Sequence, residues 1–316
     1  MNNKKNTLIL GSSGMVGSAI VRKLQNSKNT LLTPSHKQLD LINQKQVFEF
    51  FGDNKVDEIY LCAGKVGGIS ANSNFPMDFL YENLMIQTNV LHAAFRNNIP
   101  KLIFIGSSSI YPKDAPMPFK EESLLSGALE KSNEAYAIAK IAGIKFCEYA
   151  NNIFSKSRKQ YLTLMPANLY GISDDYDPSN GHVVASMISK MHNAKINSKD
   201  LILWGTGSAY REFLNVDDLS NACVLIMNKK FQELKELPFS HINVGSGVEI
   251  SIKSLAEILS NIIGYSGDII FDHSKPDGMK RKIIDSSIMK SLGWEASVEL
   301  VEGLEQTYQD FLKRDI

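Results

Sequence analysis

Short apolar runs alternate with longer amphipathic segments through the first half of the chain, and this alternation constrains the fold most. The runs rich in β-forming residues are Thr7–Leu10, Thr30–Thr33, Glu58–Cys62, Leu102–Gly106 and Tyr161–Met165. Between them lie segments with helical apolar spacing: Val16–Leu24, Val47–Phe51, Phe79–Phe95 and Tyr136–Ala150. Strands separated by helices form right-handed crossovers and a parallel sheet that is covered on both faces. We therefore predict an α/β fold with a Rossmann-type, doubly wound parallel sheet.

The pattern loosens after Pro166. Further strands are predicted at Leu201–Trp204, Ile242–Val244 and Asp268–Phe271, and helices at His182–Asn193, Asp217–Asn228, Ser251–Ile263 and Val298–Phe311. We expect a dinucleotide-binding domain formed by residues 1–168 and about 199–230. A smaller α/β substrate-binding lobe would take residues from about 169–198 and 231–316.

Composition and charge exclude several classes of protein. Lys+Arg and Asp+Glu both number 34, which gives no net attraction to nucleic acid. No apolar run approaches the roughly 18 residues of a membrane span, and the run after the first six residues is too short for a signal peptide. Cys62, Cys147 and Cys223 form no close pair, which argues against a disulfide framework and a zinc site. We expect a cytoplasmic, metal-free protein whose partners include neither nucleic acid nor a membrane.

A glycine-rich segment follows the first predicted strand directly. It comprises Gly11, Ser12, Ser13, Gly14, Met15, Val16 and Gly17, and it opens the first predicted helix. Glycines at this place permit a tight turn and let backbone N–H groups approach a pyrophosphate at the helix N-terminus. The spacing is GxxGxxG rather than GxGxxG. Its position between strand and helix favours dinucleotide binding.

The residues after the second predicted strand bear on the choice between NAD and NADP. An NAD site usually has Asp or Glu there, to bind the ribose 2′-hydroxyl. This chain has Thr33-Pro34-Ser35-His36-Lys37, and its first carboxylate is Asp40. Hydroxyl and basic groups suit a 2′-phosphate, so NADP is favoured. A solvated loop is the alternative, and it is the preferred interpretation for Lys37 alone.

Tyr136 and Lys140 are spaced to share one face of a helix. A cation beside a phenol lowers the phenol's pKa, so the pair can exchange a proton with a carbonyl or an alcohol. In isolation, such a pair is more often a surface pair. Upstream, Ser107, Ser108 and Ser109 follow the fourth predicted strand, where a third hydroxyl would reach the same site. The order of glycine motif, serine loop and YxxxK is more specific than any one motif alone.

That order resembles the extended short-chain dehydrogenase/reductases, and several segments narrow the resemblance to the GDP-L-fucose synthase family. The segments are Lys65-Val66-Gly67-Gly68-Ile69, Gly106-Ser107-Ser108-Ser109-Ile110-Tyr111-Pro112, Tyr136-Ala137-Ile138-Ala139-Lys140-Ile141-Ala142-Gly143, Asn168-Leu169-Tyr170-Gly171, Pro178-Ser179-Asn180-Gly181-His182-Val183, Arg211-Glu212-Phe213 and Lys275-Pro276-Asp277-Gly278. The resemblance runs nearly end to end. It implies an NADPH-dependent enzyme of nucleotide-sugar biosynthesis for a surface glycan, acting on a GDP-linked 4-keto-6-deoxy sugar.

The resemblance also implies catalytic roles. Hydride passes from the nicotinamide to C4, Tyr136 protonates the C4 oxygen, and Lys140 lowers the pKa of the tyrosine and holds the nicotinamide ribose. Ser107 hydrogen-bonds the ketone. The family epimerises C3 and C5 before reduction, with a cysteine and a histidine as acid and base; His182 keeps the histidine, and Ser109 stands in the cysteine's place.

The glycine motif and the resemblance together give a set of cofactor-binding residues: Gly11, Ser12, Ser13, Gly14, Met15, Val16, Gly17, Ser35, His36, Asp40, Leu41, Ala63, Gly64, Ile105, Gly106, Ser107, Tyr136, Lys140, Pro166, Asn168, Leu169 and His182. The resemblance places the sugar nucleotide against Ser107, Ser108, Asn168, Val183, Lys190, Trp204, Arg211 and Asp277. It also implies a homodimer formed through the helices at Phe79–Phe95 and Tyr136–Ala150.

Alternatives remain at several of these positions. Lys190 and Arg211 carry charges that can neutralise a diphosphate, but Arg211 could instead pair with Glu212 or Asp218. Trp204 could pack on guanine or fill core. Basic residues of the family are replaced by Ser13, Pro34 and His36.

The function itself has alternatives. A C4 reductase is the preferred interpretation, and a bifunctional epimerase-reductase is the main alternative. A sugar-nucleotide dehydratase is disfavoured because no carboxylate follows Ser107, and a non-catalytic dinucleotide sensor is disfavoured because Tyr136 and Lys140 are both kept.

Overall fold

A six-stranded, all-parallel sheet forms the centre of the molecule. The computed structural model describes residues 4–154, 159–179, 181–275 and 277–314, so the motif residues Asn180 and Pro276 lie outside the described residues. The strand order is β2-β1-β3-β4-β5-β9, and it reverses between β1 and β3. The strands are β1 Asn6–Leu10, β2 Thr30–Leu32, β3 Glu58–Leu61, β4 Lys101–Ile105, β5 Gln160–Pro166 and β9 His241–Val244. The carboxyl ends of β1 and β3 therefore flank the switch point where such sheets bind ligands.

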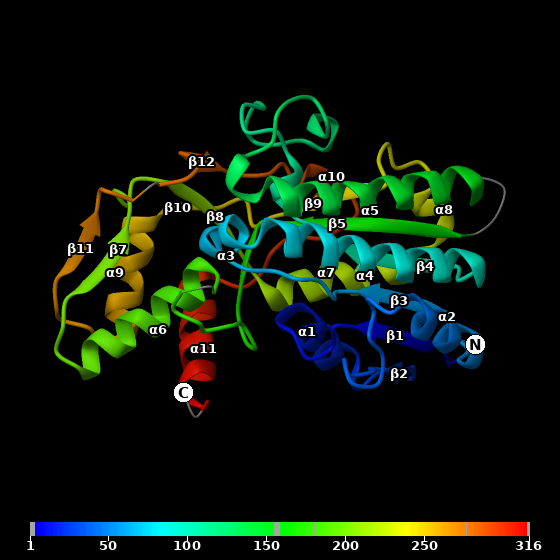
Figure 1. Cartoon of the computed structure of the whole chain (residues 1–316), viewed down its shortest axis with the longest axis horizontal. Coiled ribbons are helices and arrows are strands. Elements are labelled where there is room, and N and C mark those ends of the chain that lie inside the picture. Colours follow the sequence, from blue (N-terminus) through cyan, green and yellow to red (C-terminus); the bar gives the residue numbers. More distant parts are fainter. Residues whose placement is uncertain (1–3, 155–158, 180, 276, 315–316) are drawn as a thin grey trace.

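Helices cover both faces of this sheet (Figure 1). α1 Met15–Leu24 and α7 Val216–Asn228 share one core, and α2 Gln44–Asp53 and α4 Pro76–Arg96 share the other. α5 Glu134–Ile153 contributes buried residues to both cores. Within β3, Tyr60 faces the first core, and Ile59 and Leu61 face the second. Successive residues of a strand point to opposite faces, so a strand between two helical layers is apolar throughout. The predicted doubly wound α/β fold is confirmed.

The remaining elements form a smaller part with its own apolar core. β8 Tyr210–Asn215 pairs with β6 Asn168–Tyr170, β10 Glu249–Ser251 and β12 Arg281–Lys282, and β7 Leu201–Trp204 pairs with β11 Ile269–Asp272. Three helices share the third core: α6 Val183–Ile196, α9 Ile252–Ile263 and α11 Leu300–Leu312. The short helices are α3 Ile69–Asn74, α8 Phe231–Leu234 and α10 Ser287–Ser291. Among the described residues, no helix is long and apolar enough to cross a membrane.

Strand partners differ from the expected division of the chain at two places. β9, expected in the smaller lobe, extends the main sheet beside β5, and β7, expected with the dinucleotide-binding domain, pairs with β11. A short apolar run carries no information about its pairing partner, because pairing is settled by long-range contacts. β8 was not predicted, since Arg211 and Glu212 interrupt its apolar pattern. The exact boundaries of the two parts stay a prediction.

A buried carboxylate ties the strands of the smaller part together. Glu212 on β8 is fully buried, and its two oxygens accept hydrogen bonds from the backbone N–H of Gly247 at 2.7 Å and of Ile284 at 3.0 Å. Burial raises the pKa of Glu212, and these hydrogen bonds oppose that rise. A Cβ added to Gly245 would come within 2.2 Å of Oε1, so the carboxylate requires glycine at this position.

Glu212→Gln is expected to destabilise the fold by about 1–3 kcal/mol, because the amide N–H₂ would face a backbone N–H that then lacks an acceptor. Urea unfolding of wild type and variant measures the change. Glu305→Gln, an exposed site on α11, is the matched control. A free energy of unfolding unchanged for Glu212→Gln would show that the two backbone contacts contribute little.

Candidate functional site

The turn between β1 and α1 is shaped for a close-lying anion. Gly11 has φ +81°, and a Cβ there would come within 2.7 Å of Ala63 N; a Cβ on Gly17 would come within 2.1 Å of Gly11 O. Packing inside the protein therefore requires glycine at both positions. A Cβ on Gly14 would meet its nearest atom at an ordinary 3.6 Å. α1 begins at Met15 without a side-chain cap or an acidic residue in its first turn, so its N-terminal N–H groups are available to a phosphate.

The loop after β2 presents small polar and basic groups to solvent. Ser35 and His36 are exposed, and Ser35 Oγ donates to Gln38 Oε1 at 2.9 Å. Asp40 Oδ1 accepts from the backbone N–H of Ile42 at 3.0 Å and lies 3.8 Å from His36 Nε2. Leu41 packs in the second core. The end of β2 therefore carries no carboxylate placed for a ribose 2′-hydroxyl.

The carboxyl ends of β3 and β4 surround Lys140. Its Nζ donates to Ile105 O at 2.9 Å and lies 4.6 Å from the centroid of the Phe104 ring. A Cβ on Gly64 would come within 2.8 Å of Asn83 Oδ1 and stand at an ordinary 3.5 Å from Nζ, so the glycine is required beside Asn83. Lys140 is 4% exposed, which rules out the surface-pair alternative. Burial lowers its pKa to about 8.

Tyr136 lies one helical turn before Lys140, and the Lys140 ammonium is 5.6 Å from the centroid of its ring. Burial raises the pKa of Tyr136 to about 12, and a hydrogen bond with Ser107 opposes that rise. Loss of hydration therefore dominates the pKa of Tyr136 in the protein alone, and the expected lowering by Lys140 is not observed there. The phenol keeps its proton at neutral pH, as a proton donor must.

The three serines after β4 do not share one environment. Ser107 and Ser109 are half-buried, and the backbone N–H of Ser109 donates to Ser107 Oγ at 3.2 Å. Ser108 is 4% exposed, in the short 3-10 helix Ser108–Ile110, which makes it a weaker candidate for substrate contact. Ser109 Oγ accepts from Asn133 Nδ2 at 3.4 Å and from Lys282 Nζ at 3.3 Å. The second contact joins the site to the smaller part of the molecule.

His182 lies at the N-cap of α6, paired with an aspartate. Its Nδ1 is 3.5 Å from Oδ1 of the buried Asp174. Burial lowers the pKa of His182, but the hydrogen bond and the charge of Asp174 raise it, and the net direction is upward. Asp174 thus holds the imidazole in place and favours its charged form.

The smaller part contributes two neighbouring cations. Arg211 on β8 is in register with Lys282 on β12, and its guanidinium donates to Tyr210 O at 2.7 Å and Asp277 O at 3.3 Å. Glu212 points to the other face of the strand, and Asp218 accepts from Ser297 and Val298, so neither pairs with Arg211. Burial and the charge of Arg211 lower the pKa of Lys282 to about 8.

Of the other expected substrate residues, three have side chains that remain available to a ligand, and one has a carboxylate that is already hydrogen-bonded. Val183 and Lys190 lie on α6, and burial lowers the pKa of Lys190. Trp204 is 52% exposed at the end of β7, which excludes the core alternative. Asp277 is different, because its carboxylate already accepts from the N–H and the hydroxyl of Thr206 at 2.7 and 2.9 Å. Its observed role is to hold the loop after β7.

Pro166, Asn168 and Leu169 lie at or just after the end of β5, so the expected cofactor residues gather along the carboxyl edge of the main sheet. Asn168 Nδ2 donates to Glu212 O at 2.8 Å.

Four polar residues of the site were missed from the sequence. Asn83 on α4 accepts from the backbone N–H of Lys65 at 3.1 Å and fixes the loop after β3. Asn133 and Lys282 contact Ser109, and Asp174 contacts His182. Of these four, only Asn133 could have been predicted from the sequence, because it stands three residues before Tyr136 at the start of the same helix.

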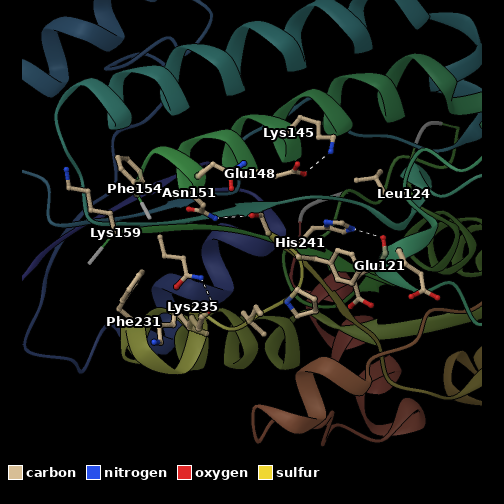
Figure 2. Close-up of a pocket in the computed structure, with 18 residues that line it drawn as sticks. Glu121, Leu124, Lys145, Glu148, Asn151, Phe154, Lys159, Phe231, Lys235 and His241 are labelled. Atoms are coloured by element: carbon tan, nitrogen blue, oxygen red, sulfur yellow. Dashed lines mark hydrogen bonds and ion pairs between the residues drawn. The ribbon is translucent and has the colours of Figure 1, made fainter. Parts of the chain in front are cut away.

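A cavity of about 680 Å³ lies elsewhere in the molecule (Figure 2). Its lining includes Gln160 at the start of β5 and His241 at the start of β9. It therefore opens at the amino ends of the parallel strands, opposite the edge where α/β sheets bind their ligands. It is separate from the site formed around Tyr136 and Lys140.

Comparisons with known proteins agree with this geometry. Residues 7–245 match the NAD dependent epimerase/dehydratase family. The chain is 44% identical over 315 residues to the GDP-L-fucose synthase of Escherichia coli (strain K12), covering 98% of this chain and 97% of that protein.

Two solved structures from Campylobacter jejuni are similar over 99% of this chain. One is a GDP-6-OMe-4-keto-L-xylo-heptose reductase, with a TM-score of 0.92, 34% identity and 99% of that chain covered. The other is a GDP-mannoheptose C4 reductase with NADP bound, with a TM-score of 0.87, 35% identity and 100% of that chain covered. The chain belongs to the NAD dependent epimerase/dehydratase family, and within it to the GDP-L-fucose synthase-like extended short-chain dehydrogenase/reductases.

Proposed function

We propose that this chain is an NADPH-dependent reductase of the C4 ketone in GDP-linked 4-keto-6-deoxy sugars. One observation carries the proposal: Ser107, Tyr136 and Lys140 converge at the carboxyl ends of β3 and β4, beside the glycine turn. The similarity to a GDP-L-fucose synthase and to two GDP-sugar reductases supports the substrate class. The product would enter the biosynthesis of a surface glycan, in the cytoplasm.

Each residue has a distinct task in this reaction. Bound NADPH supplies the hydride to C4. Tyr136, which keeps its proton at neutral pH, donates that proton to the developing C4 oxyanion, and Ser107 donates a hydrogen bond to the same oxygen. Lys140 stabilises the resulting phenolate and positions the cofactor ribose, and its pKa of about 8 leaves it charged at neutral pH.

NADPH is the cofactor that fits the chain. A relative 35% identical to it holds NADP, and the loop after β2 has serine and histidine where an NAD site needs a carboxylate. The free N-terminus of α1 and the space at Gly14 suit the pyrophosphate.

A bifunctional epimerase-reductase is the second candidate, favoured by the His182–Asp174 pair, which keeps one acid-base group in the site. Epimerisation removes a proton from a sugar carbon and returns one to the opposite face, so it also needs a second acid-base group on that face. A cysteine ionises readily enough for that task, whereas Ser109 ionises far less readily, and the partners of its Oγ among the described residues are Asn133 and Lys282 rather than a carboxylate or an imidazole. We therefore propose reduction with weak or no epimerisation.

Tyr136→Phe is expected to lower kcat for ketone reduction by roughly 10²- to 10⁴-fold while leaving NADPH affinity nearly intact, because only the proton donor is lost. Stopped-flow NADPH oxidation measures kcat, and fluorescence titration measures affinity. Tyr149→Phe, on the exposed face of the same helix, should behave as wild type. A Tyr136→Phe rate within about threefold of wild type would remove Tyr136 from the mechanism.

Reduction in D₂O separates the two candidate functions. Wild type is expected to place little deuterium at C3 or C5, as measured by NMR of the product, because no thiol is present at position 109. Ser109→Cys should gain deuterium incorporation, and Ser109→Ala should not. Deuterium entering wild-type product as fast as NADPH is oxidised would establish the bifunctional enzyme instead.

We also propose a homodimer formed through α4 and α5. Large apolar side chains remain exposed on these helices, including Met77, Tyr81, Ile138, Tyr149 and Ile153, each at least 45% exposed. A second copy would cover this apolar surface.

Light scattering should therefore give a single species of twice the 35.2 kDa chain mass at micromolar concentration. Tyr149→Glu combined with Ile153→Glu should shift the mass toward one chain, since charge would enter the buried interface. Ile202→Glu, on exposed β7, is the control. A wild-type mass of one chain would defeat the dimer.

A further inference from the structure

Ser109 has a hydroxyl proton that the protein itself does not use. Its Oγ accepts from Lys282 Nζ at 3.3 Å and from Asn133 Nδ2 at 3.4 Å. A serine hydroxyl has two acceptor positions and one O–H donor. Both acceptor positions are therefore taken, and within the described chain no hydrogen bond from the Ser109 O–H is formed. The O–H remains for a group that enters the site.

The two donors hold Ser109 from opposite parts of the molecule. Asn133 lies at the N-cap of α5, three residues before Tyr136, and Lys282 lies on β12, in register with Arg211. In its charged form Lys282 has donors and no acceptor, so it donates to Ser109 Oγ and leaves the serine O–H free. Across the described ranges, no carboxylate lies within 4.0 Å of Lys282, so its ammonium has no competing ion pair there. Asn133 and Lys282 together thus determine the direction of the Ser109 O–H.

The neighbouring serine shows which part of a bound sugar would lie there. The backbone N–H of Ser109 donates to Ser107 Oγ at 3.2 Å, so the Ser107 hydroxyl lies against the backbone of Ser109, and Ser107 is the proposed partner of the C4 ketone. Ser109 would then be beside a carbon next to C4. C3 of a 4-keto-6-deoxy sugar carries a hydroxyl, whereas C5 carries the ring oxygen and the methyl group. The C3 hydroxyl is the better acceptor for the Ser109 O–H.

We propose that Ser109 donates a hydrogen bond to the C3 hydroxyl of the keto sugar and that Asn133 and Lys282 orient it for this contact. This inference rests on the proposed function and deepens it. The position that holds an acid-base cysteine in the resembling family becomes a residue that selects substrates with a C3 hydroxyl. Lys282 and Asn133 act through Ser109 as positioning residues.

Two substrates test the selection: a GDP-4-keto-6-deoxyhexose with its C3 hydroxyl and the matching 3-deoxy sugar. Ser109→Ala is expected to lower kcat/KM for the first by roughly tenfold, the loss of one hydrogen bond, and to leave the second nearly unchanged. An equal loss for both sugars, or no loss for either, overturns the proposal. Matching thermal unfolding curves for wild type and variant establish that the alanine protein is folded.

A double-mutant cycle tests the positioning role. If Lys282 acts through Ser109, Lys282→Met should lower kcat/KM for the hydroxylated sugar in wild type but add little in the Ser109→Ala background. Lys282→Arg, which keeps a cationic donor, should restore part of the loss. Fully additive effects would show that Lys282 contacts the substrate independently, for example at the diphosphate, and would overturn its positioning role.

Measurements of equilibrium binding test the Ser109 contact independently of the proposed reductase activity. Calorimetry of the NADP complex with the GDP-6-deoxyhexose formed by C4 reduction of the test substrate, and with its 3-deoxy counterpart, requires no turnover. If wild type reduces neither ketone, the proposed reductase fails. Ser109→Ala should still weaken binding of the 3-hydroxy sugar alone, and equal affinities for wild type and variant would reject the Ser109 contact.

Discussion

The rest of the site depends on the contacts made by the buried ammonium of Lys140. It donates to Ile105 O at the end of β4, lies over the Phe104 ring and stands within one helical turn of Tyr136. Asn83 fixes the loop that carries Gly64, where a Cβ would come within 2.8 Å of Asn83 Oδ1. A cation removed from water needs such partners, so β3, β4 and α5 must meet in this one arrangement. The arrangement leaves Tyr136 at the edge of the sheet where a dinucleotide binds.

Among the described residues, three cations of the site form no ion pair: Lys140, Lys282 and Arg211. Burial lowers the pKa of both Lys140 and Lys282 to about 8, and Arg211 lies in register with Lys282. Carboxylates near these cations are used elsewhere: Glu212 binds backbone N–H groups, and Asp277 binds Thr206. Such a site suits a doubly anionic diphosphate and a cofactor with phosphate groups. The charges of Lys140, Lys282 and Arg211 are therefore available to bind anionic ligands.

Local sequence patterns predict many of the structural elements of this molecule. β1 to β5 and helices α1, α2, α4 and α5 follow from apolar periodicity, and the glycine turn follows from its place between strand and helix. The four-residue spacing of Tyr136 and Lys140 places both on one helical face. The direction of the tyrosine pKa shift did not follow, because spacing shows the nearby cation but not how much water the fold removes from the phenol. The pairing of β9 with β5 was also hidden, since a four-residue apolar run fits either sheet.

By itself, the sequence determined the fold class, the family and the edge of the sheet where chemistry takes place. Those properties depend on residues close together in the chain, whose helical or strand geometry is set by local sterics. Only the tertiary structure decided that Lys282 contacts Ser109 across 173 residues, that Trp204 is exposed and that the Asp277 carboxylate is already occupied. Such properties depend on how segments far apart in the chain pack together, and no local spacing encodes how those segments meet.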